Sequence, residues 1–411
     1  MTARMSLLIE NLTILSGREF EVIKNGWLRI EKGMISDLGE FKPPRQSSKT
    51  VDGKNLLAIP GLVDAHVHLG DAVARDIGTG STLRELVHPI HGLKNRILQN
   101  TPDTILRQAM RQTIQAMLAS GITAFADFRE GGSEGVKLAK KIMIDGQRGL
   151  ILGRPNYCFS EDKVESDEDL SVNAIKDLRE TLKISDGLGI SGPNEYTNSA
   201  LHTISELSRS CGKSVAIHAA ESAMSKRFSL AHFGETEVKR TLGHMHPRFM
   251  VHLTNATSND LDIIAERGIP IVCCPQANAA LGLGIPPIIE MLKREIKVAL
   301  GTDNVMLNEP DMFREMNYAS KMLKAEHRNP AVVTSRDVLK MVTQNAAEAL
   351  ELSKTGCLEI GKEADIVFLN LNHPNLRFSH DLVASVVHRA RRDNVTCVMA
   401  EGEIVHGSLK V

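Results

Sequence analysis

Aromatic residues make up only 4% of the sequence, and there is a single tryptophan, Trp27. Proteins that bind single-stranded nucleic acids usually stack bases on aromatic side chains, so this scarcity argues against such a role. A surplus of positive charge is also absent, because 49 lysine and arginine residues are balanced by 50 aspartate and glutamate residues. Neutralising nucleic-acid phosphates requires such a surplus. We therefore expect no nucleic-acid partner.

The sequence also lacks the patterns of secreted and membrane proteins. Its six cysteines are scattered, and none belongs to a CxxC pair, whereas small secreted domains use dense disulfide frameworks. No apolar run approaches the roughly 18 residues that a transmembrane helix needs. The sequence therefore predicts a cytoplasmic protein with no membrane partner.

What the sequence does contain is a regular alternation of apolar and amphipathic segments in its middle part. Eight short apolar runs predict strands at residues 56–68, 121–128, 149–156, 186–192, 214–220, 249–254, 269–275 and 298–303. Segments with helical spacing lie between them, for example 104–120, 198–211 and 258–268. Such alternation is typical of a parallel sheet that is buried on both faces. Eight units predict an α/β fold of the (β/α)8 TIM-barrel type. An open doubly wound sheet is the alternative, although no GxGxxG motif follows the first strand.

The two ends of the chain have a different character. Residues 1–57 read as short strands with a turn at 31–33, and the last 55 or so residues repeat this strand–turn–strand pattern. Chain ends often lie close together on a domain surface. We therefore expect residues 1–57 and 351–411 to form one small composite β-sandwich domain, and residues 58–350 to form the catalytic barrel.

Two histidines stand at the end of the first predicted barrel strand. His66 and His68 are two residues apart, so in a strand their side chains point to the same face. Paired imidazoles are natural ligands for a divalent metal ion. A pair of histidines in a turn, without a metal, is the alternative interpretation of this motif alone.

Polar residues recur at the ends of three later strands. His218 ends the fifth predicted strand, His252 the sixth, and Asp303 the eighth. Polar side chains in apolar strands cost free energy unless they are paired or bind a metal. Catalytic groups of TIM barrels lie at the carboxyl-terminal ends of the strands. Each residue alone could be structural, but together with the first two histidines they predict one site.

This ordered set resembles the amidohydrolase superfamily, and more narrowly its branch of cytosine, guanine and S-adenosylhomocysteine deaminases and triazine hydrolases. The motifs that carry the resemblance are IPGLVDAHVH at 59–68, HAAE at 218–221, CPQAN at 274–278 and GTD at 301–303. The resemblance covers nearly the whole chain. It implies a metal-dependent hydrolase on a TIM barrel. One departure is Ala277, where relatives commonly have serine.

The resemblance implies that His66, His68, His218 and Asp303 hold one metal ion and that His252 contacts the attacking water. Many relatives with two metals have a carboxylated lysine at the end of the fourth strand. The matching stretch here, 187–192, contains no lysine, which favours a single ion. Because imidazole and carboxylate suit both metals, we expect Zn²⁺, with Fe²⁺ as the alternative.

The chemistry of these groups predicts a role for each. A bound divalent ion lowers the pKa of water from roughly 15.7 to about 7. Asp303 could accept the proton of that water, and His252 could orient the resulting hydroxide. Glu221 follows His218 by three residues and could donate a proton to a ring nitrogen of the substrate. A carboxylate favoured at a helix N-terminus is the alternative for Glu221.

Candidates for substrate contact lie after the other strands and in a long loop. They are Arg129, Arg154, Asn156 and Asn278, each close to a predicted strand end. Residues 70–102 form a loop that is long enough to be a lid or a binding loop. Its His88 and His91 could be pocket residues, although a structural role is the preferred interpretation.

Three functions remain in competition. The first is an aminohydrolase that releases ammonia from a purine, a pyrimidine or a related heterocycle. The second is a cyclic-amide hydrolase, or an enzyme that removes another leaving group, on the same scaffold. The third is a binding protein without catalysis, which the complete set of proposed ligands argues against. A small-molecule partner is expected in each case, and a homo-oligomer is left open.

Overall fold

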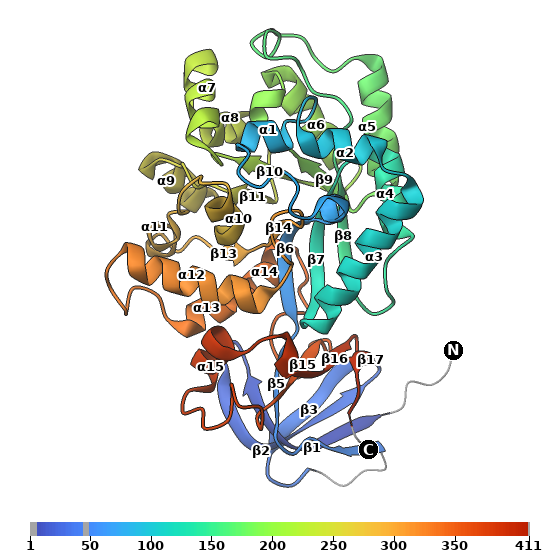
Figure 1. The fold of residues 1–411 in the computed structure, drawn as a ribbon, viewed down its shortest axis with the longest axis vertical. Helices are drawn as coiled ribbons and strands as arrows, with labels where there is room; N and C mark the ends of the chain where they lie inside the picture. Colours follow the sequence, from blue (N-terminus) through green and yellow to red (C-terminus); the bar gives the residue numbers. More distant parts are fainter. Residues whose placement is uncertain (1–5, 44–48, 410–411) are drawn as a thin grey trace.

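The protein is described by a computed structural model that covers residues 6–43 and 49–409. Two sheets organise these residues (Figure 1). A curled parallel sheet with surrounding helices occupies the middle of the chain, and a separate mixed sheet joins the two chain ends. The curled parallel sheet is consistent with the TIM-barrel class expected from the alternating sequence pattern. Its carboxyl-terminal strand ends point away from the mixed sheet.

The curled sheet contains nine strands in the order β13-β12-β11-β10-β9-β8-β7-β6-β14, and its strand pairings are parallel. The strands are β6 (Leu62–His68), β7 (Ile122–Arg129), β8 (Arg148–Gly153), β9 (Gly187–Ile190), β10 (Ser214–Ala219), β11 (Phe249–His252), β12 (Ile271–Cys273), β13 (Val298–Leu300) and β14 (Asp303–Asn304). Each predicted strand of the middle region is present. Their residues are buried almost throughout, because helices and packed side chains cover both faces.

The two ends of this strand order meet on one short segment. β13 pairs with β12, β14 pairs with β6, and only Gly301 and Thr302 separate β13 from β14. A Cβ atom on Gly301 would lie 2.8 Å from the backbone oxygen of His66, so glycine permits this close approach. The eighth strand segment therefore carries Asp303 directly to the end of β6.

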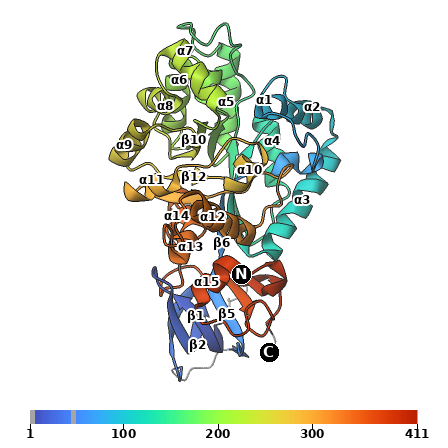
Figure 2. The same ribbon diagram turned by 60° about the vertical axis from the view of Figure 1, so that its left-hand side comes forward.

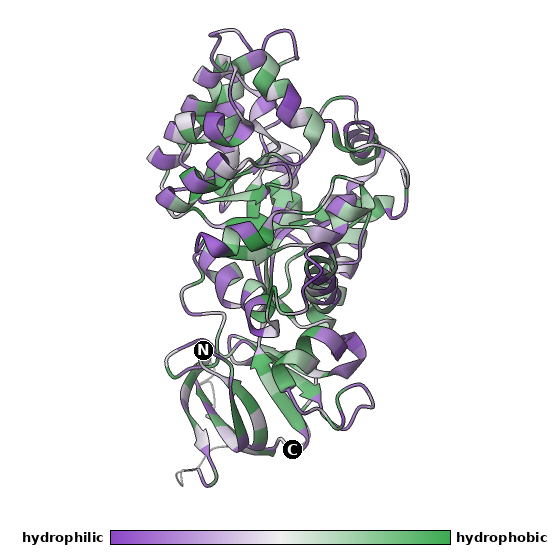
Figure 3. Ribbon diagram, turned by 90° about the vertical axis from the view of Figure 1, so that its left-hand side faces the viewer, coloured by the Kyte–Doolittle hydropathy of each residue, from purple (hydrophilic) through white to green (hydrophobic). Residues whose placement is uncertain are grey.

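Helices follow the strands along the chain and lie on the outside of the curled sheet (Figure 2). They are α3 (Asp103–Ala119), α4 (Gly132–Lys140), α5 (Val172–Ile184), α6 (Asn198–Ser210), α7 (Ala223–Phe233), α8 (Glu237–His244), α9 (Ser258–Arg267), α10 (Pro275–Ala280), α11 (Ile288–Lys293), α12 (Met312–Glu326), α13 (Ser335–Met341) and α14 (Gln344–Ala349), with a 3₁₀ turn η2 (Pro193–Glu195). Figure 3 shows the resulting pattern, with apolar strands inside and polar helix faces outside.

The first predicted strand, 56–68, is divided between the two sheets. β5 (Leu56–Pro60) pairs with β1 and β15 of the mixed sheet, whereas β6 begins at Leu62 in the curled sheet. Gly61 lies at the division, and a Cβ atom there would come within 2.2 Å of the Thr123 hydroxyl. The continuous apolar run concealed this change because residues on both sides of Gly61 are buried.

The mixed sheet brings both chain ends together, as the similar patterns of the two ends predicted. Its order is β17-β16-β15-β5-β1-β2-β3, and β4 pairs with β1. The strands are β1 (Leu7–Ser16), β2 (Glu21–Glu31), β3 (Met34–Glu40), β4 (Lys49–Asp52), β15 (Ile366–Asn370), β16 (Val395–Ala400) and β17 (Glu403–Gly407), with α15 (Leu382–Arg389) and η3 (Arg392–Asn394) between β15 and β16. The predicted turn at 31–33 joins β2 to β3. Within the described residues, no helix is both long and apolar enough to cross a bilayer.

Candidate metal and active site

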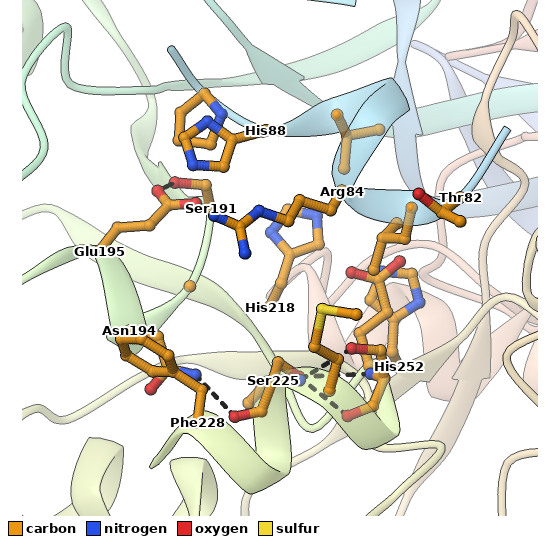
Figure 4. Close-up of a pocket in the computed structure, with 18 of the residues that line it drawn as sticks. Thr82, Arg84, His88, Ser191, Asn194, Glu195, His218, Ser225, Phe228 and His252 are labelled. Carbon is orange, nitrogen blue, oxygen red and sulfur yellow. Dashed lines mark hydrogen bonds and ion pairs between the residues drawn. The ribbon is translucent and has the colours of Figure 1, made fainter. Parts of the chain in front are cut away.

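The loop predicted at 70–102 folds over the carboxyl-terminal ends of the strands. It consists of η1 (Leu69–Ala74), α1 (Leu83–Val87) and α2 (Leu93–Asn100), and we call residues 69–100 the insert. Between the insert and the strand ends lies a cavity of about 700 Å³. Figure 4 shows Arg84 and His88 on the insert side of this cavity, with His218 and His252 on the other side. The insert is therefore one wall of the candidate site.

Four side chains from three strand ends converge at the bottom of the cavity. Nε2 of His66 lies 3.2 Å from Oδ1 of Asp303 and 3.2 Å from Nε2 of His218. Nε2 of His68 lies 3.4 Å from the same Asp303 oxygen. All four residues are buried, and their donor atoms form one group that could hold a metal ion. The structure thus brings together the four residues that the sequence predicted as ligands.

The hydrogen bonds of two of these histidines test whether a cation fits. Nδ1 of His68 lies 3.1 Å from the backbone oxygen of Phe128, and Nδ1 of His218 lies 2.8 Å from that of Ile190. A carbonyl oxygen only accepts, so each Nδ1 carries the proton and each Nε2 presents a lone pair. Nε2 of His68 faces the carboxylate of Asp303, and Nε2 of His218 faces Nε2 of His66. A divalent cation bound between these groups would stabilise the arrangement. The residues present therefore fit a metal ion.

The protonation states of His66, His218 and Asp303 also suit metal binding. Burial lowers the pKa of His66 to about 3 and holds the pKa of His218 well below its ordinary value, so both rings are neutral. Burial would raise the pKa of Asp303, but its hydrogen bond with His66 and the nearby His252 lower it instead. Oδ2 of Asp303 is buried without a hydrogen-bond partner among the described residues. Neutral imidazoles and an ionised carboxylate are the forms that bind metals.

The strand ends that carry the site have unusual backbone conformations. His252 and Asp303 have φ angles of 75° and 62°, in the left-handed region that residues other than glycine rarely adopt. Behind them, the buried Asp64 accepts hydrogen bonds from the backbone and the hydroxyl of Thr302. Such strained conformations persist only where the surroundings fix them, and they concentrate at functional sites.

The two predicted acid–base residues meet beside the four donors. Oε1 of Glu221 lies 3.6 Å from Nε2 of His252, and both side chains line the cavity. Burial raises the pKa of Glu221, although His252 opposes this shift. The backbone oxygen of Glu221 accepts a hydrogen bond of 3.0 Å from Asn255. Glu221 is thus held over the cavity rather than on the outer surface.

The four predicted substrate contacts lie in different places. Arg154 lines the cavity, and its guanidinium makes no ion pair within 4.0 Å in the part of the chain that the structure describes. Asn156 lines an adjoining cavity of about 370 Å³. Asn278 is fully buried, and its Oδ1 lies 3.1 Å from Nδ1 of His252. Arg129 is buried against Gly70 and Met110 and does not reach the cavity wall. Asn278 thus contacts His252, and Arg129 packs against Gly70 of the insert.

The insert supplies cavity residues whose roles the sequence did not reveal. His88 and His91, interpreted as structural, line the cavity as a stacked pair with ring centres 5.3 Å apart. Lys94 was not singled out at all, yet its ammonium is buried beside Glu130 and Asp71. Burial would lower the pKa of Lys94, but these two carboxylates outweigh that effect and raise it. Nothing in the local sequence distinguishes Lys94 from a solvent-exposed lysine of a polar helix.

On the strand side, the cavity is lined by further residues near β9 and on α7. Glu195 lines the cavity together with Ser191, and the serine hydroxyl donates a hydrogen bond to the glutamate carboxylate. Met224 and Phe228 of α7 add an apolar stretch to the same wall. The cavity therefore combines a polar, donor-rich bottom with apolar and charged walls, as small-molecule sites commonly do.

Comparisons with known proteins agree with this geometry. The sequence profile of the Amidohydrolase family matches residues 57–405. The chain is 30% identical over 409 residues to the 5-methylthioadenosine/S-adenosylhomocysteine deaminase of Caldanaerobacter subterraneus subsp. tengcongensis, a match that covers 98% of this chain and 93% of the relative.

Solved structures share the fold. A zinc-bound adenosine deaminase from Xanthomonas campestris superposes with a TM-score of 0.82 at 22% identity, covering 97% of this chain and 92% of that one. A zinc-bound atrazine chlorohydrolase from Arthrobacter aurescens TC1 superposes with a TM-score of 0.82 at 20% identity, covering 98% and 95%. The expected resemblance is thereby confirmed.

Proposed function

The chain belongs to the amidohydrolase family and is a metal-dependent deaminase, a hydrolase of carbon–nitrogen bonds, and we propose that its substrate is a purine nucleoside or a related amino-heterocycle. The observation that carries the proposal is the convergence of three imidazole nitrogens and one carboxylate beside the pair of Glu221 and His252. The name of the Caldanaerobacter relative supports a nucleoside with a substituent on its sugar.

We propose that His66, His68, His218 and Asp303 hold one divalent ion, with Zn²⁺ expected and Fe²⁺ as the alternative. Zinc in two structural neighbours supports this choice, as does the donor set. A second ion is not proposed, because β9 contributes no lysine to the group. When bound, the ion would supply a water with a pKa of about 7 as the nucleophile.

The residues of the chain would then perform the proton transfers. Asp303 has a buried, unpartnered Oδ2 that could accept a proton from the attacking water. His252 donates its Nδ1–H to Asn278, so its Nε2 would accept a hydrogen bond from the attacking water and orient it. Glu221, whose pKa burial raises, would give its proton to the ring nitrogen next to the carbon under attack. Asp303 would return its proton to the amino group, which would leave as ammonia as the carbon–nitrogen bond breaks, while the proton of the new hydroxyl would pass to Glu221.

Cavity size supports a substrate larger than a free base. A volume of about 700 Å³ falls within the range of sites that bury a drug-sized ligand. Arg154 on the wall could bind an anionic or hydroxyl-rich part of the substrate, and the adjoining cavity at Asn156 would extend that contact. Arg129 and Asn278 are not proposed as substrate contacts, since each faces protein groups.

We also propose finer features of the architecture. They are a closed (β/α)8 barrel over residues 58–350, a β-sandwich made of residues 1–57 and 351–411, a cytoplasmic location and assembly as a homo-oligomer. The pairing of β13 and β14 with opposite ends of the strand order supports closure of the barrel. β5 crosses the proposed domain boundary, because it pairs with β1 and β15.

An ammonia-release screen over nucleobases, nucleosides and pterins tests the proposal. We expect release from an amino-purine nucleoside by protein that contains about one equivalent of metal. Activity on lactams with no ammonia released from any amine would favour the cyclic-amide alternative. Protein with well under one bound metal, unchanged after incubation with Zn²⁺, would instead favour a binding protein without catalysis.

A further inference from the structure

Lys94 of α2 is a buried cation that no step of the proposed reaction uses. Its Nζ lies 2.6 Å from Oε1 of Glu130, 3.2 Å from Oδ1 of Asn304 and 3.4 Å from Oδ2 of Asp71, while its side chain is only 5% exposed. An ammonium has three N–H donors. Three acceptors from three separate segments therefore surround it, and the two carboxylates form ion pairs with it. Lys94 is thus placed to act through these neighbours.

The most informative neighbour is Glu130, which follows β7. The oxygen that contacts Lys94 also lies 3.2 Å from Nδ1 of His68, one of the four metal donors. The same nitrogen faces the backbone oxygen of Phe128 at 3.1 Å. Among the described residues, by contrast, Nδ1 of His218 contacts a backbone oxygen, that of Ile190, and no carboxylate. His68 is therefore a proposed metal ligand whose other ring nitrogen, Nδ1, faces a carboxylate.

We propose that Lys94 is a positioning residue of the metal centre: it holds the carboxylate of Glu130 against His68, so that the affinity for the divalent ion depends on the insert. The inference rests on the proposed metal-dependent function. A carboxylate behind a ligating imidazole fixes the orientation of the ring and makes it a better ligand. Without Lys94, Glu130 would still lie 3.8 Å from the guanidinium of Arg129, and Asp71 would still accept a hydrogen bond from the backbone of Met306, but each buried carboxylate would lose its nearest described cation.

The position of Lys94 in the chain gives this arrangement a consequence for the cavity. Lys94 belongs to the insert, whose α1 and following loop form one wall of the cavity. Asp71 lies in η1 at the start of the insert, whereas Glu130 directly follows β7 and Asn304 belongs to β14. One side chain thus ties the cavity wall to the support of a metal ligand. The placement of α2 and the surroundings of His68 therefore depend on each other.

Zinc affinity of the metal-free protein, measured by competition with a chromophoric chelator, tests the inference without using activity. We expect Lys94→Met and Glu130→Gln each to weaken zinc binding by roughly 10- to 100-fold. Arg148→Met is the matched control, because Arg148 also joins two carboxylates, the buried Asp365 at 2.8 Å and the partly exposed Glu363 at 2.7 Å, but lies at the end of β8 away from the cavity. Its zinc affinity should equal that of the wild type even if its Tm falls.

A double variant separates positioning from general loss of structure. If Lys94 acts through Glu130, the two substitutions are not additive. The zinc affinity of the double variant Lys94→Met and Glu130→Gln should then equal that of whichever single variant has the lower affinity. Additive losses would overturn the inference, and so would wild-type affinity in either folded single variant. If Lys94→Met does not fold by circular dichroism, Glu130→Gln alone decides, by the same criterion. A wild-type protein that binds no divalent ion would instead refute the proposed function itself.

Discussion

The two walls of the cavity differ in how firmly their side chains are held. On the strand side, His66, His252 and Asp303 are at most 1% exposed and are joined to one another or to buried neighbours. On the insert side, the Arg84 side chain is 58% exposed and pairs with Glu161, which is itself 54% exposed. Exposed ion pairs of this kind hold a side chain weakly.

This contrast teaches how the site divides its tasks. Reactive groups stand on parallel strands, whose backbones fix them in relation to one another. Residues that could select a substrate stand on the insert and, in Arg154, directly after β8, where a change of side chain disturbs little else. Lys94 and Asp71 differ from the exposed insert residues, since their side chains are at most 5% exposed. We expect substitutions on the two walls to have effects of different kinds.

The largest effect should follow from removing a donor on the strand wall. Asp303→Asn should lose the metal and lower the activity by roughly 10³-fold or more, because water without a metal has a pKa near 15.7. Metal analysis and steady-state kinetics measure both effects. Asp365→Asn is the control, since Asp365 is also buried but faces Arg148 far from the cavity. An Asp303→Asn protein with full metal content and activity would contradict the ligand assignment.

A smaller loss, limited to chemistry, is expected at the rim of the strand wall. Glu221→Gln should keep the metal and lower kcat by about 10²- to 10⁴-fold, since an amide cannot donate the proton. The measurement is kcat together with metal content. Equal activity in the variant and the wild type would remove Glu221 from the mechanism. A loss of metal would show instead that Glu221 belongs to the ligand set.

Arg154 lines the cavity from the end of β8, and its substitution should affect binding rather than chemistry. Because hydrogen bonds to charged groups contribute about 1.5–3 kcal/mol, Arg154→Ala should raise KM roughly tenfold or more. We expect kcat to change less than twofold. Arg154→Lys should recover part of the affinity if the contact is ionic. A fall in kcat at unchanged KM would break the proposed division between binding and chemistry.

The smallest effect concerns stability and its dependence on pH. Burial raises the pKa of Glu237 from 4.5 to about 7, while its carboxyl accepts hydrogen bonds from the backbone of Ala220 and the hydroxyl of Ser225. Since the folded state binds this proton more tightly than the unfolded state, the free energy of unfolding should fall as the pH rises from about 4.5 to 7.

Glu237→Gln should remove that part of the pH dependence. Between pH 4 and pH 8, the wild type should lose up to about 3 kcal/mol of its free energy of unfolding through Glu237, and the variant should not show this loss. Urea unfolding at several pH values measures this difference. If the free energies of unfolding of the two proteins change with pH in parallel, Glu237 does not titrate in this range, and its pKa in the folded protein is not raised.

Much of this architecture was predictable, because it depends on local patterns. Apolar runs separated by amphipathic segments predicted each strand of the curled sheet, and strand ends predicted which polar residues would meet. The division of residues 56–68 between two sheets was not predictable, since burial is continuous on both sides of Gly61. The placement of Arg129 against Gly70 was missed for a related reason: a strand end fixes the position of a backbone but not the direction of a long side chain.

The sequence by itself determined the strands, the family and the set of donors, because periodicity and residue order are properties of the chain. Tertiary structure decided which groups stand behind those donors. Lys94, Glu130, Asp71 and Asn304 are far apart in sequence and share no motif, yet their polar atoms lie within 3.4 Å of one ammonium. Such a cluster depends on how the insert folds back over the strand ends. Long-range packing sets that arrangement, and no local pattern records it.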